Sequence, residues 1–266
     1  MSFSTEILCV GNELLIGKTL DTNANWLAKR ITELGGSVKR ITIVSDEIEE
    51  ISSVIKDSLK RKPDLMITSG GLGPTHDDKT LEGVSKAIKK RLRLNKKALG
   101  YIKARYARID PKIELTKPRI KMATLPSGAK PILNPVGTAP GVLIKHGITY
   151  ILCLPGVPEE LKAIFNQFIP EFIKKLPKSY FFEEGILLHG IIESELSKFI
   201  DEVMKRNPGV YIKSHPKVIE DRNPLIELHF SSFGKDLDEI RKKVVDSIAD
   251  IIAQLSNRSK GCSEPG

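Results

Sequence analysis

Several residue types and patterns are scarce in this chain of 266 residues. It has three cysteines, Cys9, Cys153 and Cys262, and this odd number without a C-x-x-C pair argues against a disulfide or zinc framework. No apolar run reaches the roughly 18 residues of a membrane span, and no basic region followed by an apolar one marks a signal peptide. We therefore expect a soluble protein of a reducing compartment, the cytoplasm.

Glutamine is also rare, since only Gln167 and Gln254 occur beside abundant Lys, Glu and Ile, a bias that favours a thermophilic source. Charged residues make up 28% and hydrophobic residues 40%, which excludes wholesale disorder. The formal net charge is +9, and Lys and Arg crowd residues 89–105. A basic stripe can contact phosphates of nucleic acid, but no nucleic-acid motif is present, so nucleic-acid binding is a lesser alternative.

The first half of the chain alternates short apolar runs with apolar residues at helical spacing. Strands are expected at 5–10, 38–44, 65–68 and 149–154, with amphipathic helices between them. Asp46, with Glu49 three residues later, is placed to cap one of these helices. This alternation is typical of a parallel sheet covered by helices. Beyond residue 177 the pattern becomes β-α-β-β-α, so we predict domains at 1–176 and 177–256 and a flexible tail at 257–266.

A glycine-rich loop at residues 69–78 carries the strongest functional signal. It links the end of a buried strand to the start of a helix, where open α/β sheets bind ligands. Gly70, Gly71 and Gly73 let the backbone approach an anion such as phosphate closely. Asp77 and Asp78 would repel a bare phosphate, but they suit a divalent cation that bridges carboxylate and phosphate oxygens. The alternative is a tight turn in which one aspartate caps the next helix.

Three further loops lie at strand ends. Residues 11–19 are not a P-loop, because Asn12 stands where glycine is required, and His76 likewise excludes a dinucleotide fingerprint at the glycine-rich loop. The loops at 134–141 and 154–159 are rich in Pro and Gly, which suits close approach of a planar or sugar ligand or simply fixes the backbone. Polar groups suitable for metal or ribose contacts follow the first strand: Glu13, Lys18, Asp21 and Asn23. Alternatively, Asp21 or Thr22 only caps the next helix.

These stretches together resemble a known family. In their order and spacing they resemble the amino-terminal domain of the CinA family, which is a branch of the molybdopterin-binding MoaB/MogA-like fold. The stretches that carry the resemblance are residues 11–17, 21–23, 70–78, Lys121 with 126–128, 134–141 and 154–160. The resemblance implies a three-layer α/β/α domain with a mainly parallel sheet, followed by a small α+β domain. Met122 departs from the family, which typically has glutamine there. The chain is too short beyond the small domain for a nicotinamide mononucleotide deamidase domain, so that activity is not expected.

The resemblance also implies an activity. Family members of this type are metal-dependent ADP-ribose pyrophosphatases, so we expect a hydrolase that uses Mg²⁺, Mn²⁺ or Co²⁺, releases AMP and ribose 5-phosphate, and forms a homodimer. Binding of molybdopterin, or adenylyl transfer in molybdenum-cofactor synthesis, is the alternative and would use the same loop.

The site residues implied by the resemblance fall into groups. Those expected to hold the diphosphate are Gly70, Gly71, Gly73 and Thr75. The metal would be held by Asp78, assisted by Asp77 or Glu13. Lys18 or Lys121 would stabilise charge on the leaving phosphate, and Asp46 would be a second catalytic acidic position. Contacts to sugar and base are expected from Asn23, Gly137, Thr138 and Gly156.

Overall fold

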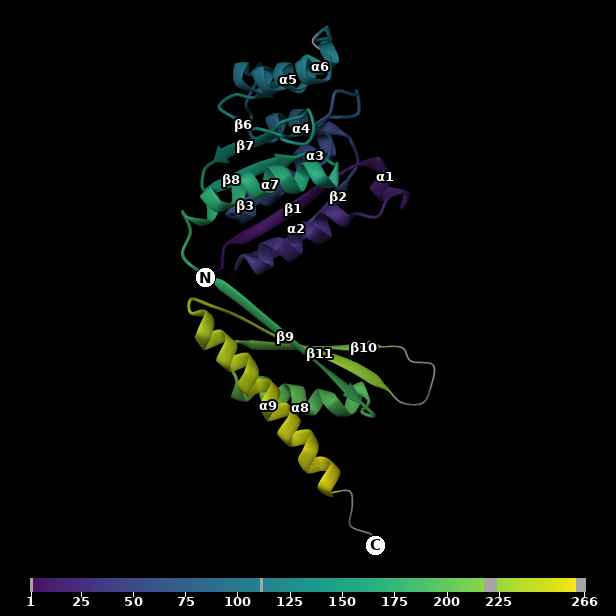
Figure 1. Cartoon of the computed structure of the whole chain (residues 1–266), viewed down its shortest axis with the longest axis vertical. Helices are drawn as coiled ribbons and strands as arrows, with labels where there is room; N and C mark the ends of the chain where they lie inside the picture. The colour runs from purple at the N-terminus through teal and green to yellow at the C-terminus, as the bar shows by residue number, and fades with distance from the viewer. Residues whose placement is uncertain (1, 111, 218–223, 262–266) are drawn as a thin grey trace. The chain divides into compact units, whose positions relative to one another are not determined.

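The computed structural model of the chain describes residues 2–110, 112–217 and 224–261. The chain divides into two compact units, shown in Figure 1: the larger comprises 3–32 and 36–177, and the smaller consists mainly of the chain from Lys178 onward, with Glu33–Gly35 and the first residues assigned to it as well. The predicted division after residue 176 lies beside this boundary. Each unit has a hydrophobic cluster of its own and is described by itself.

The larger unit is built on a mainly parallel sheet, as predicted. In order of pairing its strands are β2 (Ser37–Val44), β1 (Ser4–Val10), β3 (Leu65–Ser69), β8 (Thr149–Leu154), β7 (Gly141–His146) and β6 (Lys130–Ile132). The pairs from β2 to β8 are parallel, whereas β7 and β6 extend the sheet in antiparallel pairing. The sequence did not indicate β6 and β7, because the glycine and prolines around them are typical of a loop.

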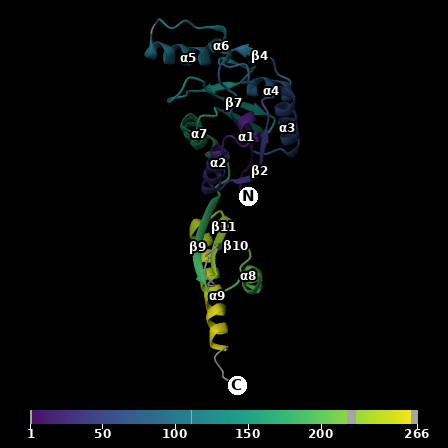
Figure 2. The ribbon, with the colours of Figure 1, turned by 90° about the vertical axis from the view of Figure 1, so that its right-hand side faces the viewer.

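Helices cover both faces of this sheet, which confirms the three-layer α/β/α prediction. Helices α2 (Thr22–Glu33) and α7 (Pro158–Ile173) lie on one face, and α3 (Ile48–Arg61) and α4 (Thr80–Ala87) on the other (Figure 2). Their apolar residues at helical spacing are buried as expected. Between α2 and α7, the rings of Trp26 and Phe165 meet edge to face with centroids 5.5 Å apart.

The segment between α4 and β6 forms elements that cover one end of this core. They are β4 (Leu92–Leu94), α5 (Lys96–Ile109), α6 (Lys117–Lys121) and β5 (Thr124–Pro126), with β4 and β5 paired antiparallel. The basic residues from Lys96 to Arg105 therefore lie on α5. Asn95 caps it by accepting the Ala98 N–H at 3.0 Å, and Ala98 and Ile102 are its buried residues.

Of the three helix caps considered from the sequence, one is formed and two are not. The N-cap of α3 is Glu47, because the Asp46 carboxylate turns away and accepts the Asn12 N–H at 2.9 Å, at the start of α1 (Asn12–Leu15). The N-cap of α4 is Lys79 and makes no side-chain cap bond. Asp21 does cap α2, by accepting the Ala24 N–H at 2.9 Å. The aspartates that follow β2 and β3 therefore stabilise neighbouring loops and not the helices beside them.

The smaller unit has the predicted β-α-β-β-α order. Its elements are β9 (Tyr180–His189), α8 (Glu193–Arg206), β10 (Val210–Lys217), β11 (Leu225–Gly234) and α9 (Leu237–Gly261). The sheet is antiparallel, with β11 between β10 and β9, and Leu228 and Phe230 of β11 are fully buried. The tail predicted from residue 257 overlaps the end of α9, and 262–266 lie outside the described residues.

Within the described residues no helix is both long enough and apolar enough to cross a membrane.

A buried ion pair at the start of the sheet gives a testable consequence. Glu6 of β1 accepts from Nε and Nη2 of Arg61 at 2.7 and 2.6 Å. Burial raises the pKa of Glu6, but the hydrogen bonds and the positive charge of Arg61 outweigh burial and hold this pKa below its ordinary value of 4.5. The stabilisation is therefore present above that pH and is lost as the pH falls below it.

We expect Arg61→Met to lower the free energy of unfolding by about 2–3 kcal/mol at pH 7, because the Glu6 carboxylate is left buried without its partner. Urea denaturation at pH 7 and below pH 4 measures this difference. It should shrink at the lower pH, where Glu6 becomes protonated. A difference that stays constant would show that Arg61 acts by packing.

Candidate functional site

A cavity of about 780 Å³ lies at the carboxyl ends of the parallel strands in the larger unit. Gly11 after β1, Asp46 after β2, the loop after β3 and the residues after β8 all line it. The strand ends thus bring four separate stretches of sequence to one place, as is usual for ligand sites of open α/β sheets. The volume suits a ligand of nucleotide size.

The charge of the lining is opposite to that of the whole chain. Among the described residues, the lining holds six carboxylates and one basic side chain, Arg105, in a protein of net charge +9. The acidic residues are Glu13, Asp21, Asp46, Asp77, Asp78 and Glu160. These charges oppose a phosphate ligand unless a cation accompanies it.

The glycine-rich loop forms one wall of the cavity. Gly70 and Gly71 have positive φ angles of 103° and 66°. The Gly70 N–H is donated to the Leu154 carbonyl at 3.0 Å, so the expected use of this N–H for phosphate is wrong: it joins the loop to β8. The N–H groups of Gly71, Leu72 and Gly73 have no hydrogen-bond partner among the described residues, so they are donors available to an anion.

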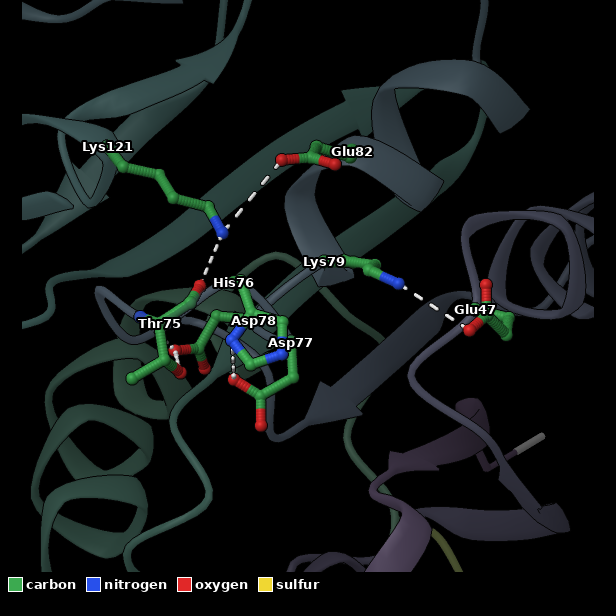
Figure 3. A network of polar contacts seen from close by, with 8 residues as sticks. All are labelled: Glu47, Thr75, His76, Asp77, Asp78, Lys79, Glu82 and Lys121. Atoms are coloured by element: carbon green, nitrogen blue, oxygen red, sulfur yellow. Dashed lines mark hydrogen bonds and ion pairs between the residues drawn. The ribbon is translucent and has the colours of Figure 1, made fainter. Parts of the chain in front are cut away.

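Asp78 is held within the same loop. Its Oδ2 accepts from the backbone N–H of Thr75 at 2.8 Å and from the Thr75 hydroxyl at 2.5 Å. Lys121 donates to the Thr75 carbonyl at 2.7 Å and lies 4.0 Å from Glu82 (Figure 3). Thr75 and Lys121 therefore position Asp78, and neither lines the main cavity; Lys121 lines a smaller one of about 250 Å³ on the other side of the loop.

The neighbouring Asp77 is ionised more readily than an ordinary aspartate. The nearby Thr75 hydroxyl, the backbone N–H of Asp77 itself and the charges of His76 and Lys121 hold the pKa of Asp77 below its usual value. His76 is 97% exposed, and its Nδ1 lies 4.0 Å from Oδ1 of Asp77; Figure 3 shows the two side chains beside each other. Asp77 is thus suited to binding a cation, and His76 remains a solvated side chain.

The loop after β1 contributes residues of different kinds. Glu13 lines the cavity, whereas Lys18 is exposed and does not. Asn23 donates to the Ser69 hydroxyl at 3.1 Å and to the Gly156 carbonyl at 2.7 Å. Its amide hydrogens therefore hold the loops after β3 and β8 together, and only its oxygen remains for a ligand.

Asn134 organises the opposite wall. Its side-chain oxygen accepts the N–H groups of Val136 and Gly137, at 3.1 and 2.7 Å, and its amide donates to the Ala139 carbonyl and to Glu160, at 2.9 and 2.7 Å. A Cβ added at Gly137 would lie 2.1 Å from the Glu160 carboxyl carbon, so a larger residue there would have to displace the Glu160 side chain. One buried amide thus fixes the backbone that presents Gly137 and Thr138 to the cavity.

Most of the predicted site residues line this cavity, and three do not. Those that line it are Glu13, Asn23, Asp46, Gly70, Gly71, Gly73, Asp77, Asp78, Gly137, Thr138 and Gly156. Lys18, Thr75 and Lys121 lie outside it. Arg105, Tyr106 and Glu160 also line the cavity but were not predicted as site residues. Arg105 and Tyr106 lie on α5, away from any recognisable motif, whereas Glu160 ends the 154–160 stretch that carries the resemblance and was not singled out there.

The buried cysteines are not nucleophiles. Burial raises the pKa of Cys153 to about 12, and burial and the carboxylate of Asp21 raise that of Cys9 well above its ordinary value. Both thiols therefore stay protonated at neutral pH, as expected for small core residues.

No ready-made metal cage is present. Within the described residues, no group of three or more His, Cys, Asp or Glu side chains converges as metal ligands. Magnesium bound to a nucleotide takes one or two carboxylates, and phosphates and water supply its other ligands. Asp78, with one carboxylate oxygen engaged by Thr75, fits that smaller requirement.

A parallel sheet between helix layers, with a glycine-rich loop at its carboxyl edge, defines a ligand-binding α/β domain. The sequence profile described as "Probable molybdopterin binding domain" matches residues 6–175, and the chain belongs to this family.

Relatives match along nearly the whole chain. A protein of Caldivirga maquilingensis is 43% identical over 257 residues, which cover 96% of this chain and 98% of the relative. One of Metallosphaera sedula is 43% identical over 248 residues, covering 93% and 92%.

Solved structures match about two thirds of the chain. "The protein CinA with unknown function" from Thermoplasma acidophilum is 39% identical, with a TM-score of 0.60, and the match covers 64% of this chain and 98% of that one. The MoaB enzyme of molybdopterin biosynthesis from Thermus thermophilus is 21% identical, with a TM-score of 0.43, over 65% and 95%.

The geometry of Gly70 predicts a strong effect of a single methyl group. A Cβ at this position would lie 2.3 Å from the Val10 carbonyl oxygen, at a φ of 103° that L-residues rarely adopt. We expect Gly70→Ala to lower the free energy of unfolding by about 2–4 kcal/mol, because the loop after β3 must move away from β1.

Gly100→Ala is the matched control. A Cβ at exposed Gly100 of α5 meets nothing within 4 Å, so this variant should change stability by less than ~1 kcal/mol, in the stabilising direction. Equal stability of the two variants in chemical denaturation would contradict the close packing of Gly70.

Proposed function

We propose that the cavity binds a nucleotide diphosphate such as ADP-ribose together with a divalent metal ion, and that the protein hydrolyses the diphosphate to AMP and ribose 5-phosphate. The observation that carries this proposal is the composition of one cavity. Free N–H groups of a glycine-rich loop, which suit phosphate, share it with carboxylates that a phosphate tolerates only when a cation lies between them.

In this proposal the phosphate and the cation are bound by different groups of the cavity lining. The N–H groups of Gly71 and Gly73 hold phosphate oxygens, while Asp78, with Asp77 or Glu13, supplies carboxylate oxygens to the cation. When bound, the metal neutralises charge and lowers the pKa of a water molecule. Asp77 is a cation ligand and not a general base, because its lowered pKa makes it a poor proton acceptor at neutral pH.

Lysine has a different role from the one expected. Because Lys121 donates to the Thr75 carbonyl, and Thr75 in turn donates to Asp78, we assign Lys121 to positioning the glycine-rich loop. Asp46 acts in a similar way on the first loop, through the Asn12 N–H. The charge on the phosphates is then balanced by backbone N–H groups and the cation.

A second function is supported by the family match over residues 6–175. In that case the same cavity binds molybdopterin, or transfers an adenylyl group during molybdenum-cofactor synthesis. Both functions need the glycine-rich loop and a cation, and they differ in the product that is released. The homodimer, the cytoplasmic location and the lack of nucleic-acid affinity remain predictions.

The decisive experiment is hydrolysis of ADP-ribose by the purified protein with Mg²⁺, Mn²⁺ or Co²⁺, with AMP and ribose 5-phosphate quantified. We expect activity that EDTA abolishes, and a loss of kcat/KM of about 100-fold or more in Asp78→Asn, which keeps the hydrogen bonds from Thr75 but loses the charge.

Glu159→Gln removes a carboxylate that is exposed and outside the cavity, so it should retain full activity. No turnover with any of the three metals, combined with binding of a pterin or of ATP, would favour the second function.

A further inference from the structure

Two stretches of the chain line the cavity, and they differ in the charged side chains that they supply. Residues from 10–78 supply five of the carboxylates and no basic side chain. Residues from 105–160 supply mostly apolar or small groups, with Arg105 and Glu160 as the charged side chains. A nucleotide has the same division, since its phosphates are charged and its base is a planar ring. The second part of the lining is therefore unlike a phosphate site.

Apolar surface is left uncovered in this second part. Val136 is 46% exposed and Val157 is 53% exposed, although both are large hydrophobic residues that line the cavity. They come from separate loops, after β6 and after β8, and the buried side chain of Met122 is a further apolar group in the lining. Such surface gains stability when a flat apolar ligand covers it.

Arg105 and Tyr106 of α5 are fixed in place before any ligand binds. Nη2 of Arg105 donates to the Val136 carbonyl, which joins α5 to the 134–139 loop. Its Nε is buried and has no hydrogen-bond partner among the described residues. The guanidinium of Arg119 lies 4.4 Å from the centre of the Tyr106 ring and steadies that ring. The site thus holds the fixed aromatic ring of Tyr106 and, on the neighbouring residue, the Arg105 Nε–H, a donor without a partner among the described residues.

We propose that Arg105 and Tyr106, together with Val136 and Val157, bind the planar nitrogen heterocycle of the ligand and determine which ring is accepted. This inference rests on the proposed nucleotide function for its choice of ring. Arg105 donates to ring nitrogen or carbonyl acceptors, and Tyr106 and the valines cover the ring surface. Adenine and pterin share this chemistry, and the experiment distinguishes them.

The test compares ligands with and without the ring. With Mg²⁺ present, calorimetry measures the affinities of AMP and ribose 5-phosphate, and inhibition by AMP and the KM report binding of ADP-ribose where it is hydrolysed, for the wild type, Arg105→Gln and Tyr106→Leu. We expect each variant to bind ADP-ribose and AMP about tenfold more weakly, with the affinity for ribose 5-phosphate unchanged. Lys103→Gln, on an exposed position of the same helix outside the cavity, is the matched control and should bind like the wild type.

The outcomes separate this inference from the proposed function. Hydrolysis of ADP-ribose that is insensitive to both substitutions, or equal weakening of all three ligands, overturns the ring subsite. Binding of AMP without hydrolysis, weakened by Arg105→Gln, supports the subsite while the hydrolase fails. Competition by a free pterin that is stronger than by adenosine assigns the same residues to the pterin ring. A wild type that binds none of these ligands overturns the inference. Circular dichroism of each variant verifies its fold, because Tyr106 also packs against the core.

Discussion

The shape of the cavity depends on the contacts that the backbone of Gly70 makes. Its N–H bonds to the end of β8, its carbonyl accepts the Thr80 hydroxyl at the start of α4, and its α-carbon lies too close to β1 for any side chain. Two parallel strands and a helix are thereby held against the strand from which the loop emerges. The N–H groups of the next three residues, which line the cavity, have no hydrogen-bond partner among the described residues.

The charges of the lining then restrict which ligands this cavity can bind. A chain with a large excess of positive charge concentrates carboxylates at this one edge of the sheet. Mutual repulsion of these groups disfavours the empty site and disfavours an anion that arrives without a cation. A cation and a phosphate that enter together relieve both problems. The acidic lining is therefore consistent with a phosphate ligand and explains why the positive surface elsewhere says little about function.

The sequence predicted the sheet, its covering helices and the glycine-rich loop, because each has a local pattern of apolar spacing or turn residues. It also placed Asp78, Asp46 and Gly137 near one edge, since strand ends of a parallel sheet meet there. It could not predict the direction of a long side chain, and Lys18 and Lys121 do not line the cavity in the structure. The place of Arg105 in the lining could not be predicted for another reason, because it depends on how α5 packs, which no short motif encodes.

Asn134 fixes the backbone of the 134–139 loop without depending on which side chains residues 136 and 138 carry. Backbone groups of residues 136, 137 and 139 are all fixed by one amide side chain, whereas the side chains of Val136 and Thr138 take no part in that network. Evolution can therefore exchange those two side chains without rebuilding the loop. Related proteins that share the asparagine can diverge in the ligands they accept while keeping one backbone, so the loop is a natural place for new specificities to arise within this fold.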